Sequence, residues 1–176
     1  QLIHKGKPTK YSFSIPRTIV NGETGWGYTQ VMNQKARQLL CGKKVPKFIK
    51  VYGHDTWAHL ACLCCGKVLY DKSVHANMRR HGNNTSMQEY HGGSFWQHQL
   101  WRIKEFVIYN KGRAVYIEGS FFLKEFWNEI PDEAKKIIIL YVKPGHRLKK
   151  ALYKKRYRDS ILDEVFLRIL FLLGKM

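Results

Sequence analysis

The chain has 176 residues, a length typical of one domain, and 44% of them are hydrophobic, which is enough for a folded core and argues against general disorder. Lys and Arg number 31 against 13 Asp and Glu, and a net charge of +18 favours an acidic partner, either nucleic acid or an acidic protein surface. The crowding of Cys62, Cys64 and Cys65 is unlike a disulfide framework and indicates a reducing compartment.

The first half of the sequence predicts both strands and helices. Residues 11–27 alternate short apolar groups with Pro and Gly, which predicts one or two short strands. Between 29 and 40 the apolar positions fall near helical spacing, and Gly42 follows as a stop. A short apolar run at 48–51 predicts another strand, whereas residues 57–70 fit either a helix or a strand pair.

The second half adds three further expected strands. Residues 114–119 and 121–123 have strand-like composition, and the β-branched run 137–142 predicts a buried strand, although Pro131 and the residues after it mark a helix start. The expected fold class is therefore α+β, with one mixed domain over residues 1–146.

Residues 147–176 change character and predict a basic amphipathic helix, or a pair of helices, that packs on the domain or extends from it. The apolar positions recur at helical spacing on one face. They are Ile161, Leu162, Val165, Phe166, Ile169, Leu170 and Leu173. The run is too short to span a membrane, which needs about twenty residues, so no membrane contact is expected.

A basic patch precedes this apolar run, formed by Arg147, Lys149, Lys150, Lys154, Lys155, Arg156 and Arg158. These side chains could pair with phosphates while Tyr153 and Tyr157 stack on bases. They fit equally well a nuclear-import patch or the solvated side of a helix.

Between residues 54 and 98 the chain is rich in His and Cys, the side chains that zinc takes in a closed site. The candidate ligands are Cys62, Cys64, Cys65, His75, His81 and His91. Only one Cys-x-x-Cys pair occurs, and the alternative is that the cysteines are small core residues. A Cys nucleophile with a His base lacks any accompanying oxyanion motif, so we expect no enzyme.

Three features in residues 54–125 resemble the adenovirus early region 4 34-kilodalton protein family. They are the Cys62-Leu63-Cys64-Cys65 cluster, the segment 85–93 that ends in Gly92-Gly93, and residues 107–110 running into 115–122, all in the order of the family. The C-terminal basic amphipathic segment is similar in character to the Arg-rich helix of that family.

The resemblance implies a viral adaptor in the nucleus and cytoplasm of the host cell. It would link Elongin B/C and a cullin ubiquitin ligase to host targets, together with a second viral early protein. Ser86, Met87, Gln88 and Tyr90 would contact Elongin, with Met87 in the place of the usual Leu anchor. The resemblance also implies a structural zinc ion, although this chain has fewer cysteines and histidines than the family. The alternative hypothesis is a basic zinc-containing protein that binds or cleaves nucleic acid.

Overall fold

The structure is a computed structural model that describes residues 14–22, 27–45, 53–71, 73, 97, 100, 104, 111–158 and 160–176. These residues form helices joined by loops and turns, with no strand among them. In chain order the helices are α1 (Ile15–Asn21), the 3-10 helix η1 (Gly27–Thr29), α2 (Gln34–Leu40), α3 (His54–Cys65), α5 (Lys111–Glu125), α6 (Asp132–Val142), α7 (Arg147–Ala151) and α8 (Ile161–Leu172).

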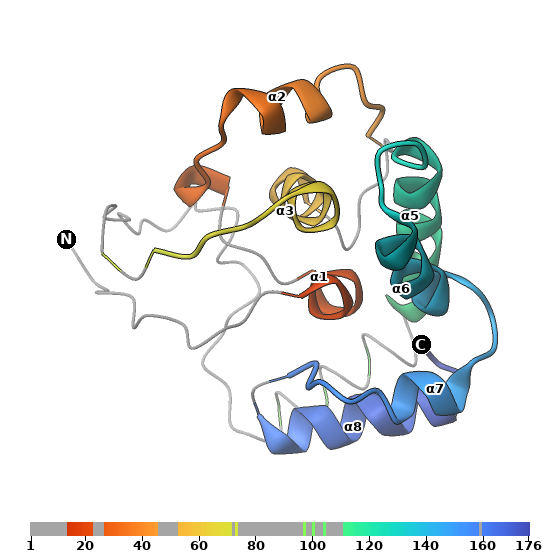
Figure 1. The fold of residues 1–176 in the computed structure, drawn as a ribbon. Helices are drawn as coiled ribbons and strands as arrows, with labels where there is room; N and C mark the ends of the chain where they lie inside the picture. The colour runs from red at the N-terminus through yellow and green to blue at the C-terminus, as the bar shows by residue number, and fades with distance from the viewer. Residues whose placement is uncertain are drawn as a thin grey trace.

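The short helix α1 lies between the other helices (Figure 1). It packs against α3, α5 and α6, while α5 and α6 pack side by side along one edge of the molecule. Helices α7 and α8 form a pair at one end, and α2 lies at the opposite end. The α7–α8 pair joins the remainder of the core through α6.

Aromatic side chains of α3 and α5 occupy the centre of the core. The Trp57 ring meets the edge of Phe122 at a centroid distance of 5.1 Å, and Phe122 stacks on Phe126 at 4.7 Å. Both Phe side chains are completely buried, and such rings contribute large apolar areas to stability. Ile19 and Val20 of α1 are buried in the same core.

Helix α6 shows why the predicted α+β fold class is wrong. The β-branched residues 137–139 belong to a helix, because Ala134, Ile138, Tyr141 and Val142 recur at helical spacing and are buried against α5 and α1. Packing of an amphipathic face outweighs the strand propensity of isoleucine, because intrinsic propensities are small beside tertiary packing. Asp132 and Glu133 in the first turn add a favourable interaction with the helix dipole.

The strands predicted at 114–119 and 121–123 are also wrong, because both runs lie within α5. The buried residues Val115, Glu118, Phe122 and Phe126 again follow helical spacing. Residues 15–21 form α1 in place of a strand: Pro16 stands in its first turn, where no amide donor is needed, and Gly22 ends it in the left-handed conformation at φ 66°.

Other sequence-based predictions are confirmed. For residues 57–65 either a helix or a strand pair was expected, and they form the helix α3. The helix expected between 29 and 40 begins at Gln34, where Asn33 caps it by accepting from the Ala36 amide at 2.9 Å. Residues 147–176, expected to form one helix or a pair, contain the two helices α7 and α8. The strand predicted at 48–51 lies outside the described residues.

None of the helices in the described part of the chain combines the length and the apolar character needed to cross a bilayer.

Replacing Phe122 with Ala should lower the free energy of unfolding by about 3–5 kcal/mol, because it removes a fully buried ring between Trp57 and Phe126. Urea unfolding followed by tryptophan fluorescence measures the effect. The matched control is Leu69→Ala at a side chain that is 78% exposed, which should change stability by no more than about 0.5 kcal/mol. Equal effects of the two substitutions would contradict this core.

Candidate docking surface

Helix α8 is apolar on two opposite faces. The inward face places Leu167, Leu170 and Phe171 in the core, each at most 2% exposed. The outward face, as we call it from here on, consists of Ile161, Leu162, Val165, Ile169, Leu172 and Leu173, which are 46–72% exposed. A helix that is apolar all round is normally covered on all sides. The outward face is therefore the strongest candidate for a binding surface in the described part of the chain.

The start of α8 is well defined. The Ser160 hydroxyl accepts from the Asp163 amide at 3.4 Å, and Asp163 and Glu164 occupy the first turn near the positive end of the helix dipole. Gly174 adopts φ 69° just after the helix, a conformation that favours glycine and ends the helix.

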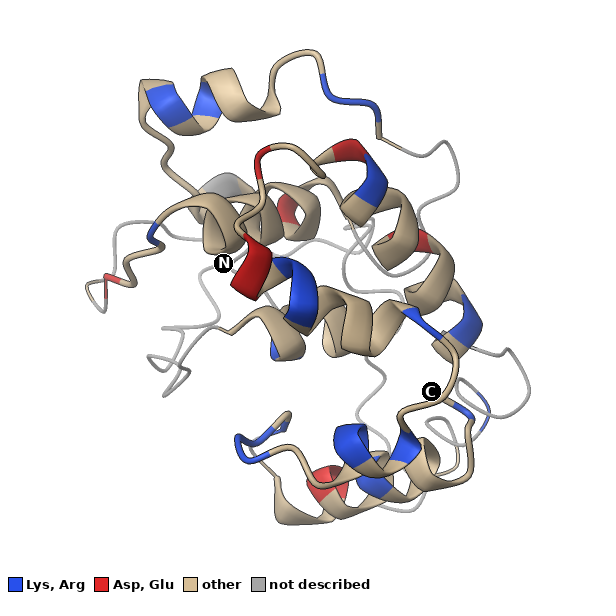
Figure 2. Cartoon of the chain, turned by 45° about the vertical axis from the view of Figure 1, so that its right-hand side comes forward, with Lys and Arg blue, Asp and Glu red and all other residues tan. Residues whose placement is uncertain are grey.

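Basic side chains lie next to α8, on α7 and on the loop of residues 152–158. The exposed ones are Arg147, Lys149, Lys154, Lys155 and Arg156. Figure 2 shows Lys and Arg along α7 and the adjoining loop. Two further apolar side chains, Leu148 and Leu152, are 66% and 76% exposed there. This end of the molecule thus combines exposed aliphatic side chains with positive charge.

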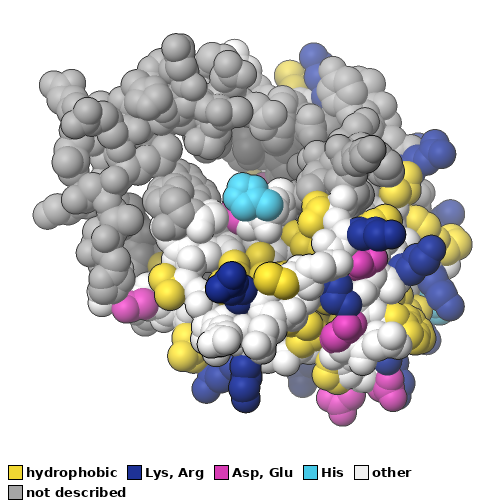
Figure 3. All heavy atoms as spheres, turned by 90° about the horizontal axis from the view of Figure 1, so that it is seen from above, with side chains coloured by type: hydrophobic (Ala, Val, Ile, Leu, Met, Phe, Trp, Pro, Cys, Tyr) yellow, Lys and Arg dark blue, Asp and Glu magenta, His cyan; other side chains and the backbone are white. Residues whose placement is uncertain are grey.

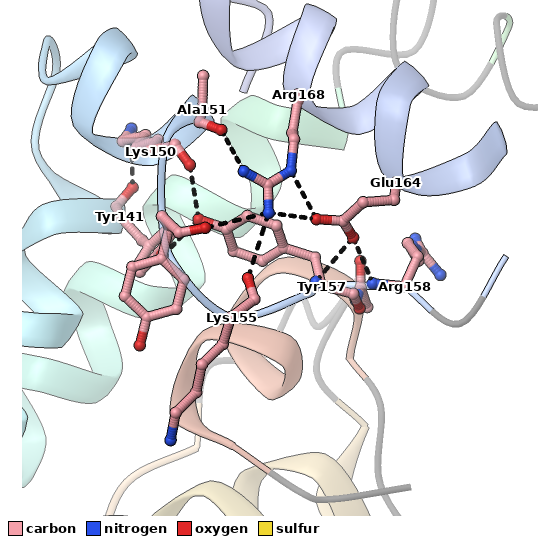
Figure 4. Close-up of polar contacts among 10 residues, drawn as sticks. Tyr141, Lys150, Ala151, Lys155, Tyr157, Arg158, Glu164 and Arg168 are labelled. Carbon is pink, nitrogen blue, oxygen red and sulfur yellow. Dashed lines mark hydrogen bonds and ion pairs between the residues drawn. The ribbon is translucent and has the colours of Figure 1, made fainter. Parts of the chain in front are cut away.

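One guanidinium group, that of Arg168 in α8, attaches this loop to the helix (Figure 4). It donates to the backbone carbonyl oxygens of Ala151, Tyr153 (3.0 Å) and Lys155 (3.3 Å). Its Nε also donates to Glu164 one turn earlier, at 2.7 Å. Charge-assisted bonds of this kind are stronger than bonds between neutral groups.

Glu164 completes the attachment from the other side. Its second carboxylate oxygen accepts from the backbone amides of Tyr157 and Arg158, each at 2.8 Å. Glu164 is 7% exposed, and a buried carboxylate is tolerated only where charge and hydrogen bonds compensate it. Arg168 and these two amides supply that compensation.

The loop also carries a buried tyrosine. The Tyr157 hydroxyl donates to the Lys150 carbonyl oxygen at 2.8 Å, so in the 2.6 Å contact with Tyr141 it is Tyr141 that donates. Burial raises the pKa of both phenols, which remain neutral. The Asn21 side chain donates to the Tyr157 carbonyl at 2.8 Å and thereby ties the loop to α1.

The structure divides the predicted basic patch. Lys150 is only 3% exposed, its ammonium group lies 3.5 Å from the Tyr141 carbonyl, and burial lowers its pKa. Arg158 is half-buried, and Tyr157 is fully buried and has no face free for a base. Five of the seven predicted basic residues remain exposed, so positive charge is present but the expected alternation with stacking tyrosines is reduced to Tyr153.

The three clustered cysteines lie near the end of α3 and do not all point the same way. Cys64 is buried in the core, whereas Cys62 and Cys65 are half-buried and lie one turn apart on the helix. Burial raises the pKa of all three thiols. The structure therefore brings together Cys62 and Cys65 as candidate ligands and leaves Cys64 as a core residue.

Within the described residues no group of three or more His, Cys, Asp or Glu side chains is arranged to hold a metal ion. His59, also on α3, is buried, and burial lowers its pKa to about 4, so the imidazole is neutral at pH 7. The other predicted ligands, His75, His81 and His91, lie outside the described residues, as do Ser86, Met87, Gln88 and Tyr90. Cys62 and Cys65 fit a zinc site if further ligands join them.

Charges are more evenly mixed at the opposite end of the molecule. Figure 3 shows the α2 side, where basic and acidic side chains lie next to one another. Lys43, which follows α2, pairs with Glu129 and donates to the Glu125 carbonyl at 3.1 Å. What distinguishes the α7–α8 end from the α2 end is therefore the row of exposed aliphatic side chains along one helix face.

Neither a family model, nor a curated protein, nor a solved structure matches this chain.

Sequence reasoning identified five of the six residues of the outward face, but it placed the buried Leu170 on the same face and omitted Leu172. It also missed the roles of Glu164 and Arg168. A signal for them is present, since an acidic and a basic residue four positions apart in a helix can pair. It could not show that Arg168 also binds three carbonyl groups of the preceding loop, because those contacts span 13 to 17 residues.

Replacing Arg168 with Met should destabilise the protein by about 2–3 kcal/mol, since it removes charge-assisted bonds to the loop and leaves Glu164 poorly compensated. Amide hydrogen exchange in residues 152–158 should become faster than in α5. The control Lys154→Met removes an exposed charge and should leave both measurements nearly unchanged. Identical exchange in the two variants would show that Arg168 does not hold the loop.

Proposed function

We propose that this protein is an adaptor that binds partner proteins and brings them together without chemical turnover. The outward face of α8 carries this proposal: six aliphatic side chains on one helix face remain exposed next to the basic α7 and loop. Contiguous apolar surface with a polar margin is typical of sites that bind other proteins.

The resemblance to the adenovirus early region 4 34-kilodalton family supports a more specific form of the proposal. In that form the chain links Elongin B/C and a cullin ubiquitin ligase to host target proteins, with a second viral early protein and in the host nucleus. Ser86, Met87, Gln88 and Tyr90 would contact Elongin, with Met87 as the apolar anchor. The α7–α8 surface would then be available for a different partner.

A second candidate function is nucleic-acid binding. The exposed side chains of Arg147, Lys149, Lys154, Lys155 and Arg156 favour it. The burial of Tyr157 and Lys150 weighs against it, because neither can contact a base or a phosphate from its position. Binding to duplex DNA that weakens steeply with rising salt would favour this second function over the first.

The adaptor proposal is tested by co-expressing the chain with Elongin B/C and measuring their elution in size-exclusion chromatography. We expect one complex, and we expect Met87→Asp to weaken it at least about tenfold, since a carboxylate would have to enter an apolar groove. Met32→Asp is the matched control, because Met32 is exposed beside α2. Separate elution of the wild-type chain and Elongin B/C would reject the Elongin assignment.

We propose further that zinc stabilises the protein through Cys62 and Cys65. Elemental analysis of protein purified without chelator should give close to one zinc per chain, and Cys62→Ser or Cys65→Ser should remove most of it. The exposed Cys41 supplies the control Cys41→Ser, which should retain the metal. A wild-type content below about half an equivalent would retire the zinc site.

A further inference from the structure

We infer that the outward face of α8 binds an amphipathic helix of an acidic partner protein, laid along α8 with its apolar side against the six aliphatic residues. This inference rests on the proposed adaptor function and specifies the chemistry of the partner at the α7–α8 end. The shape, the composition and the charge of the surface all favour such a partner.

The shape suits a helix. At about 100° per residue, the six residues of the outward face fall within an arc of about 120° along one side of α8. The spacing of Ile161, Val165, Ile169 and Leu172 gives a row that runs the length of the helix, about 18 Å. Rows of side chains separated by three and four positions are what a second helix packs into.

The composition of the face suits a protein partner. All six residues are aliphatic, and no Lys, Arg, Asp or Glu of α8 lies between them on that side: Glu164 and Arg168 are engaged with the loop. Aliphatic side chains gain from exclusion of water by another apolar surface. They offer neither donors for phosphates nor rings for bases, so nucleic acid would leave this face uncovered.

The charge of the surroundings selects an acidic partner. The exposed cations Arg147, Lys149, Lys154, Lys155 and Arg156 lie on the elements next to α8, and Arg168 and Glu164 hold the loop that carries three of them. Complementary charge steers association and suppresses wrong partners. A second copy of this chain, also with a net charge of +18, would bring like charges together.

The test uses the full chain and a synthetic helical peptide of about 18 residues, with Leu at every third or fourth position and Glu at most others. We expect saturable binding, measured by fluorescence anisotropy, that weakens as salt is raised. A peptide with the same Leu positions and Lys in place of Glu should not bind. Equal binding of the two peptides, or binding of neither, would overturn the inference.

Substitutions locate the binding on α8. Val165→Gln and Ile169→Gln replace exposed side chains and leave the inward face unchanged, and each should weaken binding about tenfold or more. Val31→Gln, at a side chain that is 99% exposed beside α2, is the matched control and should bind as the wild type does. Circular dichroism verifies that each variant is folded. Unchanged affinity of both α8 variants would overturn the inference.

Two other possible partners of the outward face, a second copy of the chain and an anionic membrane, would give different experimental results. A stable dimer abolished by Val165→Gln in sedimentation analysis would assign the face to a second copy. Flotation with vesicles containing phosphatidylserine, lost in Val165→Gln, would assign it to an anionic membrane surface. Either result overturns the inference. None of these assays contains Elongin. A negative result for the α8 peptide therefore does not affect the Met87 test of the proposed function, and a negative Met87 test does not affect the α8 inference.

Discussion

The ion pair of Arg168 with Glu164 determines how the C-terminal end of the molecule is built. The loop of residues 152–158 is neither helix nor strand, and it is held in place by hydrogen bonds from Arg168 to its carbonyls and from its amides to Glu164. With the loop held there, Tyr157 enters the core beside Tyr141 and Phe171. The exposed cations then occupy defined positions next to the outward face of α8.

A single helix thus has one side in the core and an opposite side that we propose binds a partner. The inward side of α8 belongs to the core of the folded chain, and the outward side has the same aliphatic character with no cover among the described residues. Substitutions on the inward side should lower the free energy of unfolding, whereas substitutions on the outward side should weaken only the binding of a partner. This separation makes the adaptor proposal testable with variants that keep their fold.

Sequence reasoning succeeded where local signals agree with the tertiary structure. Helices α2 and α8 both begin at a residue whose side chain caps them, and their apolar residues follow helical spacing. For α3, a helix was one of two expected alternatives. Sequence reasoning failed at α5 and α6, where β-branched residues indicated strands but buried positions at helical spacing determined the outcome. It also failed at α1, where residues 16–20 are all buried and show no helical spacing. The burial of Cys64 agrees with the alternative that the cysteines are core residues. The burial of Lys150 and Tyr157 could not be predicted, because it depends on contacts between distant segments.

The loop held by Arg168 contains Lys154, Lys155 and Arg156, and each of them is a potential cleavage point for trypsin. Proteases require an extended, accessible backbone, so cleavage here must wait until the carbonyls of Tyr153 and Lys155 separate from Arg168. Tyr157 holds the end of the same loop in the core through its own bonds to Glu164 and Lys150. The rate at which trypsin cuts after Lys154, Lys155 and Arg156 therefore reports how often this loop opens, even though their side chains lie at the surface.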